Sequence, residues 1–573
     1  MGIHNADVAD AFDEIGDLLA IEGENPFRIR AYRRAARIVR SLPRELAEMR
    51  GPEEYDAIPG IGEDLARKIL ELIRTGHLQA LERLRREVPP QTRELLALPG
   101  LGPVRVRALM RQLSVRSRSD LERALAAGRV ATLPRFGAGL ESRLKEAIAK
   151  REPGAARRLP LSVAAQYAGP LREYLASVPG VSRVEVAGSF RRGRDTVGDL
   201  DLLVSASSGT KLFAALKRYP DLRELSASGT TKASGVLRNG LQVDVRVVAP
   251  QSFGAALHYF TGSKDHNIRT RRLAQERGLK LSEYGLFRGS RRLAGQTEEG
   301  LYRALGLSYI PPELREDRGE IEAAGRGALP ALIERSDLKG DLHVHTNASD
   351  GVDTLERMVA AAQAQNLSYL AITDHAKHLG IVHGLDSERL ARQGQAIDAL
   401  NEKLRGFTIL KGAEVDILED GRLALPEAAL ERLDVVVAAV HDHFGLSEAR
   451  QTTRILRALE RPCVSILAHP SGRLIGEREP YAFDFEKVLE AMSGRGGCLE
   501  VNGQPSRLDL DDGHIQAAIE RGVPLSIASD AHSADQLANL DGAVRQARRG
   551  WARSQDVLNT RTVSGVRALL RRR

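Results

Sequence analysis

Short apolar runs that end in a histidine or a carboxylate recur throughout residues 336–573. They include YLAITDH, VVVAAVHDH, VSILAHP and PLSIASDAH, and amphipathic stretches such as TLERMVAAAQAQ and HIQAAIERG stand between them. Alternation of short apolar strands with helices is typical of parallel strands in a β/α barrel. Because the chemistry of such barrels gathers at the carboxyl ends of the strands, the polar residues that end these runs are expected to meet.

These polar residues have the character of metal ligands. His343 and His345 alternate on a predicted strand and so share one face, and Asp350 follows in a loop. The candidate ligands are His343, His345, Asp350, His375, Glu414, His441, His469, Asp530 and His532. Nine are too many for one tetrahedral zinc ion, so two or three ions are expected, with Glu414 as a bridge. Imidazole and carboxylate without thiolate suit Mn²⁺, Zn²⁺ or iron, and multi-metal sites of this type hydrolyse phosphoesters.

The net charge changes sign along the chain, from basic in the first two parts to acidic after residue 335. Lys and Arg exceed Asp and Glu by 4 in residues 1–150 and by 9 in residues 151–335, whereas Asp and Glu are in excess by 5 afterwards. Ten of the 14 histidines follow residue 335. The basic half is suited to a polyanion such as DNA, and the acidic half to a site rich in carboxylate ligands.

Cysteine content and hydropathy bound where the protein works. Cys463 and Cys498 are the only cysteines, and they lie outside any CxxC motif, which fits a reducing cytoplasmic compartment. No apolar run approaches the length needed to span a bilayer, so we expect no membrane association.

A unit of turn and helix repeats near the N-terminus, after a first helix predicted to be capped by Asn5. IPGIGEDLARKILEL and LPGLGPVRVRALMRQL are two copies, and LPRFGAGLESRLKEAI is a degenerate third with Arg-Phe in place of Gly-apolar. Glycine permits a tight turn, and the free N–H groups of the following helix start favour an anion. Helix–hairpin–helix motifs of DNA repair enzymes look like this, so Gly60, Gly62, Gly100 and Gly102 are candidate DNA-phosphate contacts. Plain helix-capping turns are the alternative.

The string VAGSFRRGRDTVGDLDLLV brings carboxylates and phosphate-binding residues together. Asp199 and Asp201 would share one face of a strand, and such close carboxylates repel each other unless cations bridge them. Pairs of Mg²⁺ ions do this in phosphoryl-transfer enzymes, and Asp244 in LQVDVRVV is the candidate third ligand. The small residues at 188–189 would let phosphates approach, and Arg192 could neutralise them. Solvent-facing acids at a strand end are the alternative.

This string resembles the palm of the family X DNA polymerases, the group of DNA polymerase beta. LHYFTGSKDHNIRTRRLAQERGLKLSEYGLF resembles the thumb of that family. The resemblance implies that Asp199, Asp201 and Asp244 bind Mg²⁺ or Mn²⁺ and catalyse nucleotide addition, with Asp244 helping to deprotonate the primer 3′-hydroxyl. It also implies a set of nucleotide contacts, which are Ser189, Arg192, Gly198, Tyr259, Phe260, Gly262, Asn267 and Arg271.

The first repeat is similar to the small lyase domain of the same family. There Lys68 matches the lysine that forms a Schiff base with an abasic sugar, whereas His77 stands where the vertebrate lyase has another lysine. A nucleophilic lysine needs a lowered pKa, which burial or neighbouring positive charge can supply. A solvated lysine on a helix face is the alternative.

The motifs HVHTNASDG, TDH, GAE, VH, AHP and SDAH resemble the PHP (polymerase and histidinol phosphatase) domain, a distorted β/α barrel. All nine family ligand positions carry a suitable residue. By these motifs the chain resembles the bacterial-type family X DNA polymerases with a C-terminal PHP domain. The resemblance implies a gap-filling repair polymerase with a Mn²⁺-dependent 3′-5′ exonuclease, and abasic-site endonuclease and 3′-phosphatase as further activities. It predicts a monomer at the nucleoid that binds gapped or nicked duplex DNA and dNTPs, with other repair proteins as a further option.

The predicted architecture is multidomain, with α and α/β parts. Two helical helix–hairpin–helix domains come first, then a nucleotidyltransferase palm with a mixed β-sheet, a small thumb, and the distorted β/α barrel. The predicted boundaries are 1–88 (lyase-like), 89–155 (fingers-like), 156–250 (palm), 251–312 (thumb), 313–335 (linker) and 336–573 (PHP).

Three other functions remain open at this point. The PHP domain could be structural, since some family members lose their ligands, although the complete ligand set argues against this. The chain could bind DNA ends without synthesis, which the carboxylate triad argues against. It could also be a small-molecule phosphatase, which the basic half disfavours.

Overall fold

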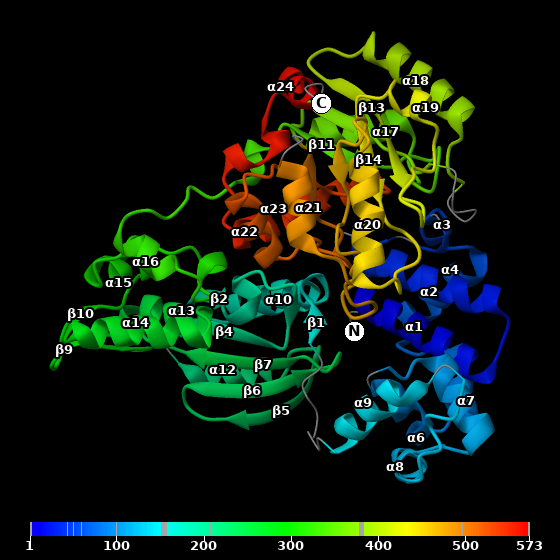
Figure 1. Ribbon diagram of the computed structural model, residues 1–573. Helices are drawn as coiled ribbons and strands as arrows, with labels where there is room; N and C mark the ends of the chain where they lie inside the picture. Colours follow the sequence, from blue (N-terminus) through cyan, green and yellow to red (C-terminus); the bar gives the residue numbers. More distant parts are fainter. Residues whose placement is uncertain are drawn as a thin grey trace. The chain divides into compact units, whose positions relative to one another are not determined.

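The structure of the chain is a computed structural model, shown as a ribbon in Figure 1. It describes residues 3–42, 44–49, 51–58, 60–98, 100–134, 136–149, 158–206, 208–376, 383–493 and 497–570. Within these ranges no helix is both long enough and apolar enough to cross a membrane. The chain forms two compact units, which are residues 1–157 with 238–240, and residues 158–237 with 241–573.

The first unit is helical, as the amphipathic repeats predict. Its helices are α1 (Asn5–Glu22), α2 (Pro26–Ser41), α3 (Pro52–Asp56), α4 (Glu63–Thr75), α5 (Gln79–Glu87), α6 (Pro90–Arg93), α7 (Pro103–Leu113), α8 (Arg118–Ala126) and α9 (Gly137–Ala149). Their apolar faces share one core. The predicted cap at Asn5 is wrong, because His4 precedes α1 and Asn5 is its first, buried residue. The side chain of Asn5 instead bonds the backbone of Leu42, Arg44 and Leu46, so it holds a distant loop.

The two hairpin turns have the expected backbone. Gly60 and Gly100 have φ of 86° and 81°, a left-handed conformation that favours glycine. Gly62 and Gly102 stand directly before α4 and α7, at the helix N-cap. In the degenerate third copy Arg135 lies outside the described residues, and Phe136 is buried in the helical core. The turn–helix prediction is therefore confirmed for the two good copies.

The predicted palm contains a five-stranded mixed sheet beside α10 (Leu161–Ala176) and α12 (Gly209–Leu216). Its strands are β2 (Val181–Val186), β4 (Asp199–Ala206), β5 (Leu222–Ser228), β6 (Lys232–Leu237) and β7 (Gln242–Val247), in the order β2-β4-β7-β6-β5. Neighbours pair antiparallel except β4 and β7, which are parallel. The mixed sheet is thus confirmed.

The predicted thumb follows the palm sheet directly. It consists of α13 (Phe253–Thr261), α14 (Lys264–Glu276), the hairpin strands β8 (Lys280–Ser282), β9 (Gly285–Arg288) and β10 (Arg291–Ala294), and α15 (Glu298–Ala304). Its core takes in residues of the segment predicted as a linker, among them Leu314 of a short 3-10 helix and Ile321 of α16 (Glu320–Gly325). Much of this Pro- and Gly-rich segment is therefore packed rather than solvated.

The C-terminal part is a parallel barrel of seven strands. They are β11 (Gly340–Val344), β12 (Tyr369–Ile372), β13 (Thr408–Asp416), β14 (Val435–Ala439), β15 (Ile466–Leu467), β16 (Cys498–Asn502) and β17 (Leu525–Ala528), each paired to the next. A parallel bridge from Val344 to Ala531 brings the last strand back to the first. These strands are almost wholly buried, as continuous apolar runs predict.

Helices cover the outside of the barrel. They are α17 (Leu355–Ala364), α18 (Ser387–Asn401), α19 (Glu427–Leu430), α20 (Glu448–Leu459), α21 (Phe485–Ser493), α22 (Asp512–Glu520), α23 (Leu540–Arg549) and α24 (Val563–Leu570) (Figure 1). Several begin at a side-chain cap, such as Thr354 before α17, Asp386 before α18 and Asp511 before α22. The predicted distorted β/α barrel is confirmed.

A buried ion network ties the palm to the thumb. Glu298 accepts two hydrogen bonds from Arg191, at 2.9 and 2.7 Å, and it also pairs with the fully buried Arg315. Burial alone would raise the pKa of Glu298, but Arg315 and Arg191 outweigh it and lower the pKa to about 2. The carboxylate is therefore needed to neutralise two guanidinium groups that water reaches poorly.

We expect Glu298→Ala to lower the free energy of unfolding by about 3 kcal/mol, because it leaves buried positive charge without a partner. Differential scanning calorimetry of the purified chain measures this as a lower transition midpoint. Glu299→Ala is the matched control, since Glu299 is the next residue of the same helix and is exposed. Equal midpoints for the two variants would contradict the assignment.

Candidate metal centres and nucleotide site

Three predicted carboxylates meet where β4 and β7 run side by side. Asp201 pairs directly with Asp244 in the parallel register, and Asp199 pairs with Gln242 two residues earlier. Asp244 accepts a hydrogen bond from the Ser234 hydroxyl, and it lies 3.3 Å from the amine of Lys232. The strands therefore place the three carboxylates on one face, as the spacing predicts.

The electrostatics of this face favour a cation. Burial, followed by the charges of Asp199 and Asp244, raises the pKa of Asp201 from 3.8 to about 7. A carboxyl whose pKa is raised by its neighbours gains most from a positive ion that replaces the proton. The donor set therefore suits a divalent cation.

The short turn before β4 supplies groups for a phosphate. The hydroxyl of Ser189 is buried and, among the described residues, makes no hydrogen bond. Gly188 has a φ of 62°, and a Cβ there would approach Asp201 to 2.7 Å, so only glycine fits beside the carboxylates. Arg192 donates to the carbonyl of Thr261 at 2.7 Å, which connects this turn to the end of α13. Gly198 stands immediately before β4, at the same edge.

The predicted nucleotide contacts of the thumb also lie together. Asn267 donates to the carbonyls of Tyr259 and Gly262, at 2.7 and 3.2 Å, and its Oδ1 is buried without a partner among the described residues. Arg271 donates to the carbonyl of Asn267 and lies 5.9 Å from the centre of the Tyr259 ring, which contacts Phe260 edge to face. One turn between α13 and α14 thus gathers all five predicted thumb residues.

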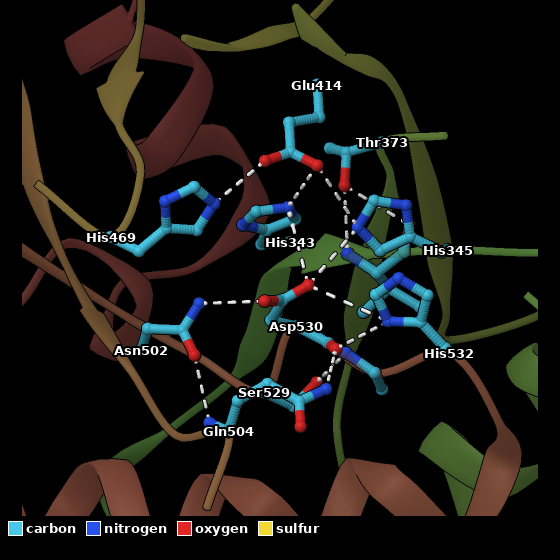
Figure 2. A network of polar contacts seen from close by, with 12 residues as sticks. His343, His345, Thr373, Glu414, His469, Asn502, Gln504, Ser529, Asp530 and His532 are labelled. Atoms are coloured by element: carbon cyan, nitrogen blue, oxygen red, sulfur yellow. Dashed lines mark hydrogen bonds and ion pairs between the residues drawn. The ribbon is translucent and has the colours of Figure 1, made fainter. Parts of the chain in front are cut away.

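The nine predicted ligands of the barrel converge at the carboxyl ends of its strands. Eight of them form three groups, and within each group the ligand atoms lie within 4.8 Å of one another. The first group is His345, Asp350, His375 and His532; the second is His343, His345 and Asp530; the third is His375, Glu414 and His441. The ninth, His469, lies 3.0 Å from Glu414 through its Nε2. Figure 2 shows Glu414 at the top and Asp530 near the centre, with the imidazoles of His343, His345, His469 and His532 around them.

Several of these rings are oriented by partners that the sequence reasoning did not single out. Glu500 of β16 lies 2.6 Å from His343 Nδ1 and also accepts from the backbone N–H of His469, at 2.6 Å. Asp416 of β13 lies 2.7 Å from His441 Nδ1. The contacts at His343 and His441 occupy Nδ1 and direct Nε2 into the cluster, as carboxylates that orient metal-binding histidines do. Glu500 stands in the middle of β16, between Leu499 and Val501, and no local pattern marks it as a partner of His343.

Two further buried carboxylates hold the ligand-bearing loops. Asp374 accepts from the backbone N–H and the hydroxyl of Thr346, at 2.8 and 2.6 Å, and from Gln393, and so it supports the loop that carries Asp350. Asp341 accepts from the backbone N–H and the hydroxyl of Ser529, beside Asp530. The ligands are thus backed by a layer of fixed hydrogen bonds.

The buried nitrogen atoms of this cluster fit metal ions. Within the described residues, His343 Nε2, both ring nitrogens of His345 and His469 Nδ1 are buried and make no hydrogen bond. Burial favours the neutral form of Glu414, but His375, His441 and His343 outweigh it and hold its pKa well below the ordinary range. Ionised carboxylates among imidazoles with free nitrogens are the ligand set of a divalent transition metal.

One arginine reaches the cluster from a neighbouring loop. The Nε of Arg507 lies 3.8 Å from Asp530, and its side chain is 18% exposed. Burial, followed by the charge of Arg507, lowers the pKa of His469 to about 4. Arg473 bonds the carbonyl of Arg507 at 2.8 Å and thereby positions its loop. A fixed, partly exposed guanidinium beside carboxylate ligands is suited to an anionic substrate group.

The structure supports the predicted hairpin turns as open sites but places Lys68 in an ion pair. A Cβ added to Gly62 or Gly102 would meet no atom within 4 Å, so both hairpin turns are open to a ligand. Lys68 is 15% exposed and pairs with Asp64 in the preceding turn of α4. That contact pairs the amine with a carboxylate, whereas a Schiff-base lysine reacts as the neutral amine.

Comparison with protein families matches each part of the chain. A helix-hairpin-helix domain matches residues 3–78, and a SAM-like helix-hairpin-helix tandem matches residues 92–150. The DNA polymerase beta palm matches residues 158–273, the DNA polymerase beta thumb residues 256–316, and the PHP domain residues 341–503.

Individual relatives agree with these matches. The chain is 37% identical to the DNA polymerase/3'-5' exonuclease PolX of Bacillus subtilis, over an alignment of 576 residues that covers 100% of both proteins. It is 27% identical over 346 residues to DNA polymerase lambda of Rattus norvegicus, covering 55% of this chain and 56% of that one. It is 31% identical over 215 residues to a probable phosphatase of Syntrophotalea carbinolica, covering 36% of this chain and 84% of that one.

The raised pKa of Asp201 predicts a pH-dependent instability of the metal-free protein. The folded state keeps a proton on Asp201 up to about pH 7, whereas an unfolded aspartate loses it near pH 3.8, so stability falls as pH rises between these values. An asparagine at this position cannot ionise, so in the presence of a chelator we expect Asp201→Asn to melt at a higher temperature than the wild-type protein. The difference between the two melting midpoints should grow from about pH 5 to about pH 8. A difference in melting midpoint that stays constant with pH would contradict this prediction. Added Mg²⁺ should make the difference smaller.

The contact between Glu500 and His343 predicts an effect on metal affinity. We expect Glu500→Gln to weaken Mn²⁺ binding about 10- to 100-fold, because His343 loses the partner that orients its ring. Isothermal titration of the metal-free protein with Mn²⁺ measures this. Glu486→Gln is the control, since Glu486 is exposed on α21 and pairs with Arg521. Equal Mn²⁺ affinities of Glu500→Gln and Glu486→Gln would show that Glu500 does not support the metal site.

Proposed function

This chain belongs to the family X DNA polymerases that carry a PHP domain, and from that premise we propose that it fills short gaps in duplex DNA and trims DNA 3′ ends. The proposal rests on the full-length relationship to a DNA polymerase/3'-5' exonuclease and on two separate candidate metal centres in one chain. One centre would add nucleotides to a 3′ end, and the other would remove them.

The observation that carries the polymerase assignment is the pairing of Asp201 with Asp244 on parallel strands. This pairing brings Asp199, Asp201 and Asp244 to one face, beside the Ser189 hydroxyl, which has no hydrogen-bond partner in the part of the chain that the structure describes. Three carboxylates next to a phosphate-binding turn are what a nucleotidyl transfer needs. Asp199, Asp201 and Asp244 would hold Mg²⁺ or Mn²⁺, which when bound stabilises the charge that develops on the transferred phosphate.

The side chains around this face divide the remaining work. Asp244, held by Ser234 and Lys232, would accept the proton of the primer 3′-hydroxyl. Ser189 and Arg192 would bind the triphosphate, with the backbone of Gly198 alongside.

The thumb turn would check the fit of the new base pair. Tyr259 and Phe260 would lie against the sugar, while Asn267 and Arg271 would contact the minor-groove edge. Acceptors on that edge are common to all correct pairs, so these contacts would test shape rather than sequence.

The barrel cluster would hydrolyse the 3′ end. Its nine ligands would hold two or three ions of Mn²⁺, Zn²⁺ or iron, which when bound activate water and clamp a phosphate. Glu414 lies between five imidazoles and is suited to bridge two of these ions. Arg507 would neutralise the phosphate before cleavage.

The substrate follows from the basic, helical half of the chain. The hairpin turns at Gly60, Gly62, Gly100 and Gly102 would bind the DNA backbone without reading its sequence. The first turn of α4 contains Glu63 and Asp64, whereas that of α7 has no acidic residue, so the second hairpin is the stronger phosphate site. A gapped or nicked duplex in the cytoplasm, at the nucleoid, is the substrate that this arrangement favours.

Further activities are extensions of the same sites. The barrel resembles relatives described as probable phosphatases, which supports 3′-phosphatase activity beside the exonuclease, and abasic-site cleavage would use the same hydrolytic centre. Lyase activity through Lys68 is the weakest part of the proposal, because Lys68 is paired with Asp64.

A gapped duplex with a labelled primer tests both centres at once. We expect Asp244→Ala to lower extension with dNTPs at least about a hundredfold and to leave 3′-end degradation unchanged. We expect Asp530→Ala to do the reverse, because the two carboxylates belong to separate clusters. Product length on a denaturing gel measures both rates in the presence of Mg²⁺ or Mn²⁺.

Each alternative gives a different result in this assay. Degradation that survives Asp530→Ala would make the barrel structural, and an absence of extension by the wild-type protein would leave a DNA-end binding module. If the barrel were a small-molecule phosphatase, a free phosphomonoester would be hydrolysed in preference to a DNA 3′ end and would inhibit its degradation.

A further inference from the structure

Helix α23 of the barrel packs against the turn of the palm that carries Arg192. Gly193 is buried beneath this helix, and a Cβ there would approach Arg545 to 2.5 Å. Arg549, at the end of α23, donates to the backbone carbonyl of Arg192 at 2.8 Å. A residue from the barrel therefore contacts a residue of the proposed nucleotide site.

A shared carboxylate makes this contact a network. Glu316 accepts from Arg192 Nε at 3.0 Å and from Arg549 Nη1 at 3.1 Å through the same oxygen, and Arg194 lies 3.7 Å away. The exposed fractions of these side chains are 13% for Arg192, 11% for Glu316 and 2% for Arg549. Poor access to water strengthens each interaction.

Arg549 is itself held from the barrel side. Its second terminal nitrogen donates to Asp512, at the start of α22, and Arg318 pairs with the same carboxylate at 3.0 Å. Arg549 thus has two acidic partners, one in the barrel and one in the segment that follows the thumb. This gives its guanidinium a defined position from which to orient Glu316.

The network leaves part of Arg192 available. Nε bonds Glu316 and Nη1 bonds the carbonyl of Thr261, at 2.7 Å. A guanidinium has five N–H groups, and within the described residues the two on Nη2 make no hydrogen bond. Arg192 is therefore held from one side while donors for a phosphate remain on the other.

From this geometry we propose that Arg549 is a positioning residue of the nucleotide site, which acts through Glu316 to orient Arg192 toward the triphosphate. The proposal rests on the proposed polymerase function. It makes α23 of the barrel a working part of the polymerase, so the two activities share structure although their metal centres are separate.

The test measures kcat and KM for a dNTP on a gapped duplex. We expect Arg549→Gln to raise KM for the dNTP about fivefold to tenfold while kcat changes less, because the triphosphate contact is weakened before the chemical step. Arg549→Lys keeps the charge but not the two-sided contact, so its KM should lie between those of the wild type and Arg549→Gln.

Arg548→Gln is the matched control. Arg548 is the neighbouring residue of α23 and also pairs with the segment 313–335, through Glu313 at 2.8 Å and Glu334 at 2.7 Å, but within the described residues it makes no hydrogen bond or ion pair with Glu316 or Arg192. Its KM for the dNTP should equal that of the wild type. The 3′-5′ exonuclease rate of each variant reports whether the barrel remains folded.

A double-mutant cycle of Arg549→Gln with Glu316→Gln tests whether Arg549 acts on Arg192 through Glu316. If Arg549 acts through Glu316, the double variant should have a KM close to that of the more affected single variant rather than the product of both effects. Equal KM values for Arg549→Gln and Arg548→Gln would overturn the proposal, and so would a lower KM, which would mean that Glu316 withholds Arg192.

Arg192→Ala separates the two levels of inference. A raised KM for Arg192→Ala with an unchanged KM for Arg549→Gln would refute the positioning role and leave the polymerase assignment standing. An absence of extension by the wild-type protein would refute the polymerase assignment, and the positioning role with it.

Discussion

Parallel strand pairing is the constraint on which both candidate centres depend. Strands that run in the same direction present their carboxyl ends at one edge, so residues far apart in the chain meet there. In the barrel this brings His375, Glu414 and His441 together from three successive strands. In the palm the parallel pair β4 and β7 places Asp201 opposite Asp244, there toward the amino ends of both strands. Antiparallel pairing in the barrel would carry alternate ligands to the opposite edge.

The convergence of ligands creates charge that the protein neutralises in two ways. Around the barrel cluster, carboxylates held ionised, together with buried nitrogens that have no hydrogen bond among the described residues, fit metal ions. Between the palm, the thumb and the barrel, opposite charges neutralise one another through Glu298 and Glu316. Breaking such a buried pair leaves an uncompensated charge, which is more costly than losing a surface pair. The interfaces within the second unit are therefore defined by specific partners.

Local patterns in the sequence are sufficient to predict which candidate ligands converge, but not the groups that orient them. An apolar run that ends in histidine identifies a strand end, and a carboxylate pair two residues apart identifies a shared face. The partner of His343 is Glu500, 157 residues away, and nothing near either residue predicts the contact. The segment 313–335 was predicted as a linker from its Pro, Gly and charged residues, yet Arg315 within it is fully buried because Glu298 neutralises it.

The sequence by itself therefore determined which elements this protein contains. They are helical hairpins, a mixed-sheet palm, a thumb and a parallel barrel, with the candidate site residues that these elements carry. These follow from periodicity and spacing, which act over a few residues. Only the tertiary structure decided which carboxylate orients which imidazole, and that Arg549 of the barrel reaches Glu316 and Arg192. Such contacts depend on how separate elements pack, and burial then sets the strength of each charge pair.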